Sequence, residues 1–324
     1  MGLDIIDKKI VGTIDNLEDK LEGKLPVDRL ELLYLVNSWG RHYKFYTSGV
    51  NNMEIEQCEP KECYDLSKLD TSEITNMDYI FKYSLFTGDI NLWDVSNVST
   101  MNEMFDYAKN FNQPLNQWKT SNVINMSGMF RSSVFNQDIS QWDVSKVTNM
   151  NEMFSYARYF NQNINSWDVS NVTDMSYMFH KSREFNQPLN QWNTSKVIDM
   201  KGMFACVESF NQDISSWDVS NVTNMIIMFA ETKVFNQNIG NWNLDNIIDC
   251  DFMFDNAKTF LDRYNGGKPL PIYTDKIKEW FNLNSDKMIA IDIKDKYGDE
   301  IDGFFINVHS KNKDVLNKLN KMDK

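Results

Sequence analysis

The sequence predicts an α/β repeat solenoid, and three observations lead to this prediction. Tryptophan recurs at a fixed step, at Trp93, Trp118, Trp142, Trp167, Trp192, Trp217 and Trp242. Methionine keeps the same step of 25 residues, with one step of 24, at Met101, Met126, Met150, Met175, Met200 and Met225. The unit from Phe160 reads FNQNINSWDVSNVTDMSYMFHKSRE before the next FNQ begins. A period of this length indicates one supersecondary unit per repeat, stacked on its neighbours.

Composition excludes several classes of protein. The chain has 324 residues, of which 42% are hydrophobic, so it can bury a large core. Its net charge of −13 would repel phosphate backbones and anionic headgroups, which predicts no nucleic-acid partner and no membrane-surface binding. No apolar run of about 18 residues exists, so we expect no membrane insertion.

The start of the chain and its cysteines predict the compartment. MGLDIIDKKIVG has neither the basic start nor the apolar stretch of a signal peptide. Four scattered cysteines do not form a disulfide framework. We therefore expect an intracellular (cytoplasmic) or virion-associated protein with reduced thiols.

Residues 1–62 are predicted to form a helical N-terminal cap. A helical spacing links Leu3, Ile6, Ile10, Ile14, Leu17 and Leu21. Gly23 would end this helix, and Pro26 suits the first turn of a second one, with an apolar face of Leu30, Leu33, Tyr34, Val36 and Trp39. The stretch LPVDRLELLYLVNSW also resembles the opening of an F-box, and a plain cap helix matches it as well.

Residues 63–263 are predicted to form about eight repeats, each with one short parallel strand and one short helix. The spacing at Ile164, Trp167 and Val169 is that of leucine-rich repeats and predicts a strand with Trp and Val inward. Val172, Met175, Met178, Phe179 and Ser182 follow at helical spacing, and Thr173 stands where an N-cap would serve that helix. The strand-to-strand crossover should be right-handed, which gives a right-handed leucine-rich-repeat-like solenoid.

Residues 264–324 are predicted to form a small α+β cap that closes the open end of the solenoid. Thr274 would cap a helix through Ile277, Trp280 and Phe281. Two strands of a hairpin are expected at 288–293 and 303–308. A tail helix at Val315, Leu316 and Leu319 would end the chain.

The motif WDVSNVTDMSYMF, with FNQ before and after it, resembles the BspA-like leucine-rich repeat family. The resemblance covers about residues 66–262. It implies a binding or adhesive role in surface proteins of bacteria and mycoplasmas, or in proteins of giant DNA viruses and protists. Because the chain has no signal sequence or lipobox cysteine, it resembles the viral or protist branch more closely.

The search for chemistry predicts a non-enzymatic protein without cofactor or metal. The three histidines, His42, His180 and His309, have no acid–base or metal constellation beside them. None of the motifs H-E-x-x-H, G-x-S-x-G, G-x-x-x-x-G-K-[ST] and G-x-G-x-x-G occurs. Cys58 and Cys63 lack a second pair, so no zinc site is expected. An enzyme in the C-terminal segment would have one histidine and no nucleophile constellation.

The candidate binding face is a set of positions that follow each tryptophan. They are expected to point outward from the sheet: Asp94, Lys119, Asp143, Asp168, Asn193, Asp218 and Asn243. This polar, mildly acidic surface would suit a polar or basic protein partner. The alternative is that each Asp only fastens the strand to the Ser-Asn turn behind it. The strict asparagines Asn112, Asn136, Asn161, Asn186, Asn211 and Asn236 are expected to form an internal ladder that satisfies turn backbone groups.

These features predict a protein–protein interaction scaffold that uses the acidic sheet face. The alternative is a cell-surface or virion-surface adhesin that binds protein or glycan. Display on an outer surface would favour the adhesin.

Overall fold

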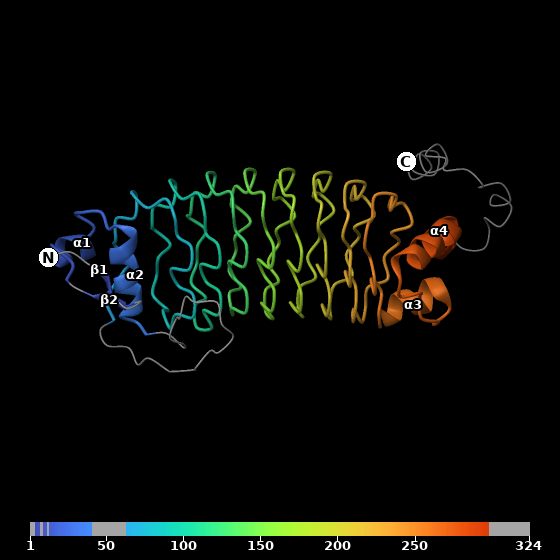
Figure 1. The fold of residues 1–324 in the computed structure, drawn as a ribbon, viewed down its shortest axis with the longest axis horizontal. Coiled ribbons are helices and arrows are strands. Elements are labelled where there is room, and N and C mark those ends of the chain that lie inside the picture. Colours follow the sequence, from blue (N-terminus) through green and yellow to red (C-terminus); the bar gives the residue numbers. More distant parts are fainter. Residues whose placement is uncertain (1–3, 7–8, 12, 41–62, 298–324) are drawn as a thin grey trace.

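A computed structural model describes residues 4–6, 9–11, 13–40 and 63–297 of the 324-residue chain. Most of these residues form successive units, one for each sequence repeat, that stack in one row, and we call each of these units a coil (Figure 1). Helices α1 (Leu17–Leu21) and α2 (Arg29–Asn37) lie at one end, with the antiparallel strands β1 (Asp4–Ile6) and β2 (Lys9–Val11). Helices α3 (Lys258–Asn265) and α4 (Thr274–Tyr297) lie at the other end.

Backbone hydrogen bonds join neighbouring coils along the row. We call the recurring residue at the centre of this contact the ladder methionine: Met77, Met101, Met126, Met150, Met175, Met200 and Met225, with Cys250 in the last coil. From each ladder methionine onward, alternate residues donate their N–H to the next coil, as Met175 does to the Asp199 carbonyl at 3.0 Å. The residues between them close turns within their own coil, as Met178 does by donating to Met175 at 3.1 Å. The backbone is therefore satisfied by tight turns and by the adjoining coil.

Secondary structure within the coils differs from the prediction. The predicted helix after Val172 is a series of turns, and the predicted strand at Ile164 contains a turn closed by the Trp167 N–H. Parallel pairing falls instead on the residue before each ladder methionine: Asn76, Thr100, Asn125, Asn149, Asp174, Asp199, Asn224 and Asp249. The helix prediction was wrong because successive turns of three to four residues turn apolar side chains inward at nearly the helical period.

Thr173 also has a role other than the predicted helix cap. Its N–H and its hydroxyl both donate to the Thr148 carbonyl of the preceding coil, at 2.9 and 3.1 Å. The residue thus links two coils and caps no helix.

Two backbone positions in each coil are left-handed. They lie two residues after the ladder methionine (Tyr79, Glu103, Gly128, Glu152, Tyr177, Gly202, Ile227, Phe252) and six residues after it (Tyr83, Tyr107, Ser132, Tyr156, Lys181, Cys206, Glu231, Asn256). Each of these residues is the third of four in a turn that a backbone hydrogen bond closes, as the Met178 N–H closes the turn over Tyr177 by donating to the Met175 carbonyl. A positive φ at the third residue is typical of a type II turn, which favours glycine or asparagine at that position. At Gly202 a Cβ would lie 2.5 Å from the ring of Tyr177, so glycine also gives this ring its room. Ile227 is the least suited residue, because it is β-branched and has a φ of 51°.

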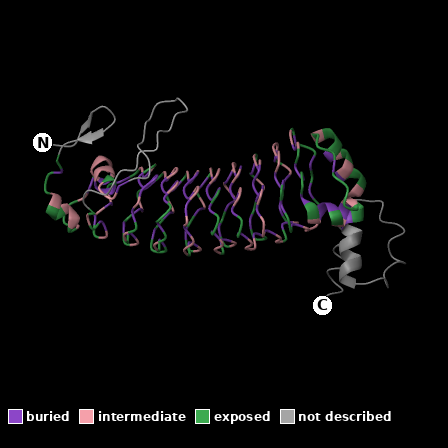
Figure 2. Ribbon diagram, turned by 90° about the horizontal axis from the view of Figure 1, so that it is seen from below, coloured by how far each residue is buried: buried purple, intermediate pink, exposed green. Residues whose placement is uncertain are grey.

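Phenylalanine rings form two columns through the core. One column contains Phe81, Phe105, Phe130, Phe154, Phe179, Phe204, Phe229 and Phe254, with neighbouring centroids 5.0 to 5.8 Å apart. The second column contains Phe160, Phe185, Phe210, Phe235 and Phe260, at 6.0 to 6.1 Å. All these rings are buried, and Figure 2 shows buried residues recurring in coil after coil along the row. The core is therefore continuous along the stack, which is how a repeat array gains its stability.

The terminal segments extend these aromatic columns. Trp39, just after α2, packs edge-on against Phe86 at 4.9 Å. At the other end, Phe281 of α4 lies 5.9 Å from Phe254, and Trp280 lies 6.4 Å from Phe260. Both ends of the row are thus covered by aromatic side chains.

Each tryptophan links its coil to the preceding one. The indole nitrogens of Trp93, Trp118, Trp142, Trp167, Trp192, Trp217 and Trp242 donate to buried carbonyls one coil back, at 2.8 to 3.3 Å. The tryptophan period therefore arises from both packing and a polar bond.

The C-terminal cap differs from the prediction. Thr274 is the first residue of helix α4 and not the predicted cap, because its hydroxyl donates to Asp251 and accepts the Cys250 N–H. The helix continues to Tyr297 and includes 288–293, which were predicted as a strand. A short apolar run cannot be assigned to strand or helix by pattern alone, and no glycine or proline interrupts the chain from Thr274 to Tyr297. The predicted strand at 303–308 and the tail helix at Val315 lie outside the described residues.

The N-terminal cap is also less helical than predicted. Residues 4–6 and 9–11 pair as strands, with Ile5 opposite Ile10, and only Leu17–Leu21 of the first predicted helix is helical. The β-branched residues in these two segments favour strands over helix. Helix α2 is present, but it begins after Asp28, whose side chain forms a capping box with Glu31, and Pro26 instead pairs with Asp70. Its buried residues are Leu32, Leu35 and Val36, so the predicted apolar face was only partly right.

Replacing Ile227 by glycine should stabilise the protein, because the substitution removes the cost of a β-branched residue at positive φ. We expect the free energy of unfolding to rise by about 0.5–1 kcal/mol, the difference between that cost and the entropy of glycine. The neighbouring change Ile226→Gly, at a residue without positive φ, should lower it by about 1 kcal/mol or more. Chemical denaturation of both variants checks this, and a loss of stability in Ile227→Gly would contradict it.

Trp167→Phe should lower the free energy of unfolding by about 1–3 kcal/mol. The variant loses the bond to the Ile139 carbonyl and leaves a void beside the phenylalanine column. Tyr159→Phe, on an exposed ring, serves as the control and should change stability by less than about 0.5 kcal/mol. Equal stability of the two variants in denaturant titrations would show that the indole bond contributes nothing.

Candidate functional site

The seven residues predicted as a binding face are all exposed: Asp94, Lys119, Asp143, Asp168, Asn193, Asp218 and Asn243. They lie in turns and not on a sheet. The side chain of every Asp or Asn among them accepts the N–H of the residue two positions later, as Asp143 accepts from Ser145 at 3.0 Å. The turn-fastening role, which was the alternative prediction, is thus present at every position except Lys119.

Hydrogen bonding also lowers the pKa of three of these carboxylates. The hydroxyl and the N–H of Ser145 lower the pKa of Asp143, and the same two donors of Ser96 and Ser220 lower the pKa of Asp94 and of Asp218. The Ser145 hydroxyl lies 2.6 Å from the carboxylate oxygen of Asp143. These bonds favour the ionised form of Asp94, Asp143 and Asp218.

The asparagine of each FNQ motif forms the predicted internal ladder. The side-chain oxygen of Asn161 accepts the N–H of Asn186 in the next coil at 3.0 Å, and the same bond recurs from Asn112 to Asn236. The glutamines add a further bond, as Gln187 does to Asn161 at 3.1 Å. At the end of the series, the Tyr264 hydroxyl of α3 donates to the Asn236 carbonyl at 3.0 Å. This prediction is confirmed.

Side chains that differ from coil to coil gather elsewhere. We define the variable edge as the two left-handed positions of each coil together with the position five residues after the ladder methionine. The latter holds Lys82, Asp106, Arg131, Ser155, His180, Ala205, Ala230 and Asp255. Sequence reasoning missed this edge because it assigned these positions to a helix. The signal was present, since these positions vary far more between repeats than the positions after tryptophan.

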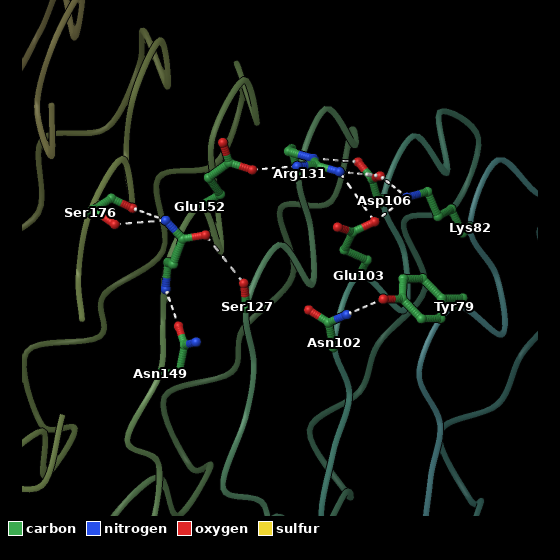
Figure 3. Close-up of polar contacts among 11 residues, drawn as sticks. Tyr79, Lys82, Asn102, Glu103, Asp106, Ser127, Arg131, Asn149, Glu152 and Ser176 are labelled. Atoms are coloured by element: carbon green, nitrogen blue, oxygen red, sulfur yellow. Dashed lines mark hydrogen bonds and ion pairs between the residues drawn. The ribbon is translucent and has the colours of Figure 1, made fainter. Parts of the chain in front are cut away.

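A charged network crosses the first coils of the variable edge (Figure 3). Asp106 is fully buried and accepts two hydrogen bonds from Arg131, at 2.8 and 3.0 Å, with Lys82 at 3.1 Å. Glu103 contacts Lys82 and Arg131, and Arg131 also contacts Glu152. Five charged groups from four adjoining coils are therefore joined.

Burial and charge oppose each other inside this network. Burial raises the pKa of Asp106, although the hydrogen bonds from Arg131 act against that rise. The bonds to Asp106 in turn raise the pKa of Arg131 above its usual range. Removing one member of a buried ion pair typically costs about 3–5 kcal/mol, so the network fastens these coils to one another.

Tyrosines and cations alternate along the same edge. Lys82 lies 5.4 Å from the ring centroids of both Tyr79 and Tyr83. Lys181 lies 4.6 Å from the centroid of Tyr156 and donates to its hydroxyl at 2.9 Å. Tyr79 and Tyr156 remain 38% and 47% exposed, so these rings can contact a partner.

His180 lies among these tyrosines. Its ring is 5.1 Å from that of Tyr156 and 5.5 Å from that of Tyr177. Burial and the charge of Lys181 lower its pKa to about 4, so it is neutral at physiological pH. A packing role therefore fits this histidine better than acid–base chemistry.

Side chains that could bind a metal ion do not cluster within the described ranges. No group of three or more His, Cys, Asp and Glu side chains there could hold an ion. Cys63 is exposed, whereas Cys58, His42 and His309 lie outside these ranges.

The fold and the ladders define a repeat protein whose coils hold one another together. One family model, described as a Mycoplasma protein of unknown function, DUF285, matches three overlapping stretches, 50–166, 126–211 and 153–266. These cover more than half of the 324 residues, and the chain belongs to this family. No curated protein and no solved structure matches it. No helix in the described part of the chain has the length and apolar character needed to cross a membrane.

Asp143→Asn should lower stability slightly near neutral pH, because the charged turn bond is lost, and should reduce the further loss of stability in acid. Asn193 already makes the same turn bond, at 3.1 Å, so the turn should persist. Because the pKa of Asp143 is lower folded than unfolded, its contribution is complete above the unfolded value of about 3.9 and is lost as pH falls through the folded pKa. Thermal midpoints at about pH 6 and about pH 3 measure the difference.

The reverse change, Asn193→Asp, is the matched control for this prediction. It should add acid sensitivity at a turn of the same geometry. Parallel pH profiles for wild type and both variants would contradict the assignment.

Proposed function

We propose that this chain is a non-enzymatic protein–protein interaction scaffold, built as a leucine-rich-repeat-like solenoid of the BspA-like type. The observation that carries the proposal is the division of its surface. Turn and ladder positions repeat the same polar side chains, whose hydrogen bonds hold the coils, whereas the variable edge differs in every coil. A constant frame with varied side chains on one edge is how repeat proteins present binding surfaces.

Rigidity of the frame supports this proposal. Backbone bonds, indole bonds and phenylalanine columns connect each coil to the next throughout the row. Side chains on such a frame lose little conformational freedom on binding, which lowers the entropic cost of association.

Two surfaces compete for the partner. The variable edge offers the exposed rings of Tyr79 and Tyr156 and the partly exposed cation of Lys181, and tyrosine is enriched among the residues that dominate interface energetics. The acidic turn face offers Asp94, Asp143, Asp168 and Asp218 to a polar or basic partner, as predicted from the sequence. We favour the variable edge, because its side chains can differ between coils without loss of the turn bonds.

An adhesin that binds protein or glycan is the second candidate. The resemblance to BspA-like surface proteins favours it, and exposed tyrosines such as Tyr79 and Tyr156 suit glycan as well as protein. Localisation of the protein to a cell or virion surface would support the adhesin, whereas an intracellular location would support the scaffold.

The test compares three forms of the protein in cross-linking and capture from cells that express it. The first is wild type. The second carries Asp143→Asn, Asp168→Asn and Asp218→Asn, which remove charge and keep the turn bonds. The third carries Tyr79→Asn and Tyr156→Asn, because asparagine tolerates the positive φ at both positions. Circular dichroism and thermal midpoints confirm that all three are folded.

We expect the edge variant to lose the partner at least about tenfold in apparent affinity and the turn variant to retain it. Loss in the turn variant alone would place binding on the acidic face. A wild-type protein that captures no partner, or whose cross-links all map outside the coils, would overturn the scaffold proposal.

A further inference from the structure

The variable edge at Tyr156 and Lys181, together with the residues just after it, combines exposed aromatic rings with several cations. Tyr156, Arg158 and Tyr159 come from the coil of Met150, and Lys181 and Arg183 come from the coil of Met175. We call these five residues the basic–aromatic patch. Tyr156 and Tyr159 are 47% and 46% exposed, and Arg158 and Arg183 are exposed as well.

Backbone contacts bring the two coils together at this patch. The Tyr156 N–H donates to the His180 carbonyl at 2.7 Å, and the Glu184 N–H donates to the Arg158 carbonyl at 3.2 Å. The five side chains therefore arise from directly adjoining turns and share one area of surface.

The cations of the patch are only lightly engaged with carboxylates. Arg183 lies 3.5 Å from Glu208. In the part of the chain that the structure describes, no carboxylate lies within ion-pair distance of Arg158 or Lys181. Lys181 is held over the ring of Tyr156, which positions its charge at the surface. Such exposed charges gain most from an incoming anion.

The coils farther along the row lack this combination. Arg158 and Arg183 stand eight residues after their ladder methionines, where later coils hold Glu208, Lys233 and Lys258. Lys233 pairs with Glu208 at 3.4 Å, and Lys258 pairs with Asp262 at 2.7 Å. No tyrosine accompanies these lysines at the left-handed positions of their coils. Earlier in the row Tyr107 and Lys109 form a similar pair, 5.4 Å apart, but the adjoining coils hold Leu85 and Val134 at the position of Arg158. At this repeat position, cations from adjoining coils therefore meet tyrosines only at this patch among the coils compared.

We propose that the basic–aromatic patch docks an acidic segment of a partner protein, one in which an apolar or aromatic residue lies between carboxylates. The arginine forks can bind carboxylates through two parallel hydrogen bonds, and the tyrosines supply rigid contact area between them. This inference rests on the proposed scaffold function and names the chemistry of its partner.

Charge distinguishes a short acidic segment from a nucleic acid. The chain as a whole carries −13, which would oppose the long, uniform charge of a phosphate backbone. A short segment interacts mainly with charges within about 8 Å, the screening length at physiological salt, so the local cations decide its binding.

The test measures fluorescence polarisation of a labelled short peptide of alternating Glu and Asp with one central Phe. We expect saturable binding to the full chain, weakened at least about tenfold by Arg158→Gln with Arg183→Gln. Tyr159→Ser should weaken it about threefold or more. The matched control, Lys233→Gln with Lys258→Gln, removes the same charge from the same repeat position and should change the affinity less than about twofold.

Further probes separate the possible outcomes. Loss of binding when Gln and Asn replace the acids supports recognition of carboxylates, and a labelled single-stranded DNA should bind more weakly than the acidic peptide. Absent peptide binding, equal weakening by both charge pairs, or tighter binding of the DNA would each overturn the proposal. The scaffold proposal would stand in those cases if wild type still captured a partner through another part of the edge.

Discussion

The coil-to-coil hydrogen-bond ladder is the constraint on which the rest of this structure depends. From each ladder methionine onward, every second N–H donates to the next coil, while the residues between them close turns within their own coil. A single coil leaves half of these donors without partners, so it gains its structure only from a neighbour. This need explains why the sequence repeats so strictly, and at the last coil Thr274 and Ile272 accept the N–H groups of Cys250 and Phe252. The rings of Trp39, Trp280 and Phe281 cover the apolar core at the two ends.

The ladder also determines which residues are free to vary. Positions whose side chain makes a bond between coils accept few residue types, as the asparagines of FNQ and the tryptophan indoles show. The left-handed positions of the turns tolerate tyrosine, glutamate, lysine and even isoleucine, because their N–H makes the intercoil bond and their side chains lie outside it. The strained backbone conformations of each coil therefore lie at the positions where the side chains differ between coils. The variable edge is a consequence of the turn geometry, and the proposed scaffold function uses it.

Charge gives the row a direction that the repeat alone lacks. The Lys82, Asp106 and Arg131 network occurs at the N-terminal coils, whereas the basic–aromatic patch follows in the coils of Met150 and Met175. The first set of charges is largely buried and mutually paired, so it fastens the coils to one another. The second set is largely exposed and lightly paired, so it can bind an incoming acidic segment. Burial, and not residue type, separates the two roles.

The sequence by itself determined the repeat, its register and the residues that face the core. Trp167, Met175 and Phe179 are buried as the period required, and the asparagine ladder follows from its strictness. The sequence did not decide between helix and successive turns, because both turn apolar side chains inward at similar spacing. Tertiary structure made that choice through bonds between residues about one repeat apart, which no local pattern contains. The acidic positions, which were predicted on a sheet face, fasten turns in the folded protein. Tyr156 and Lys181 meet only because their two coils stack side by side.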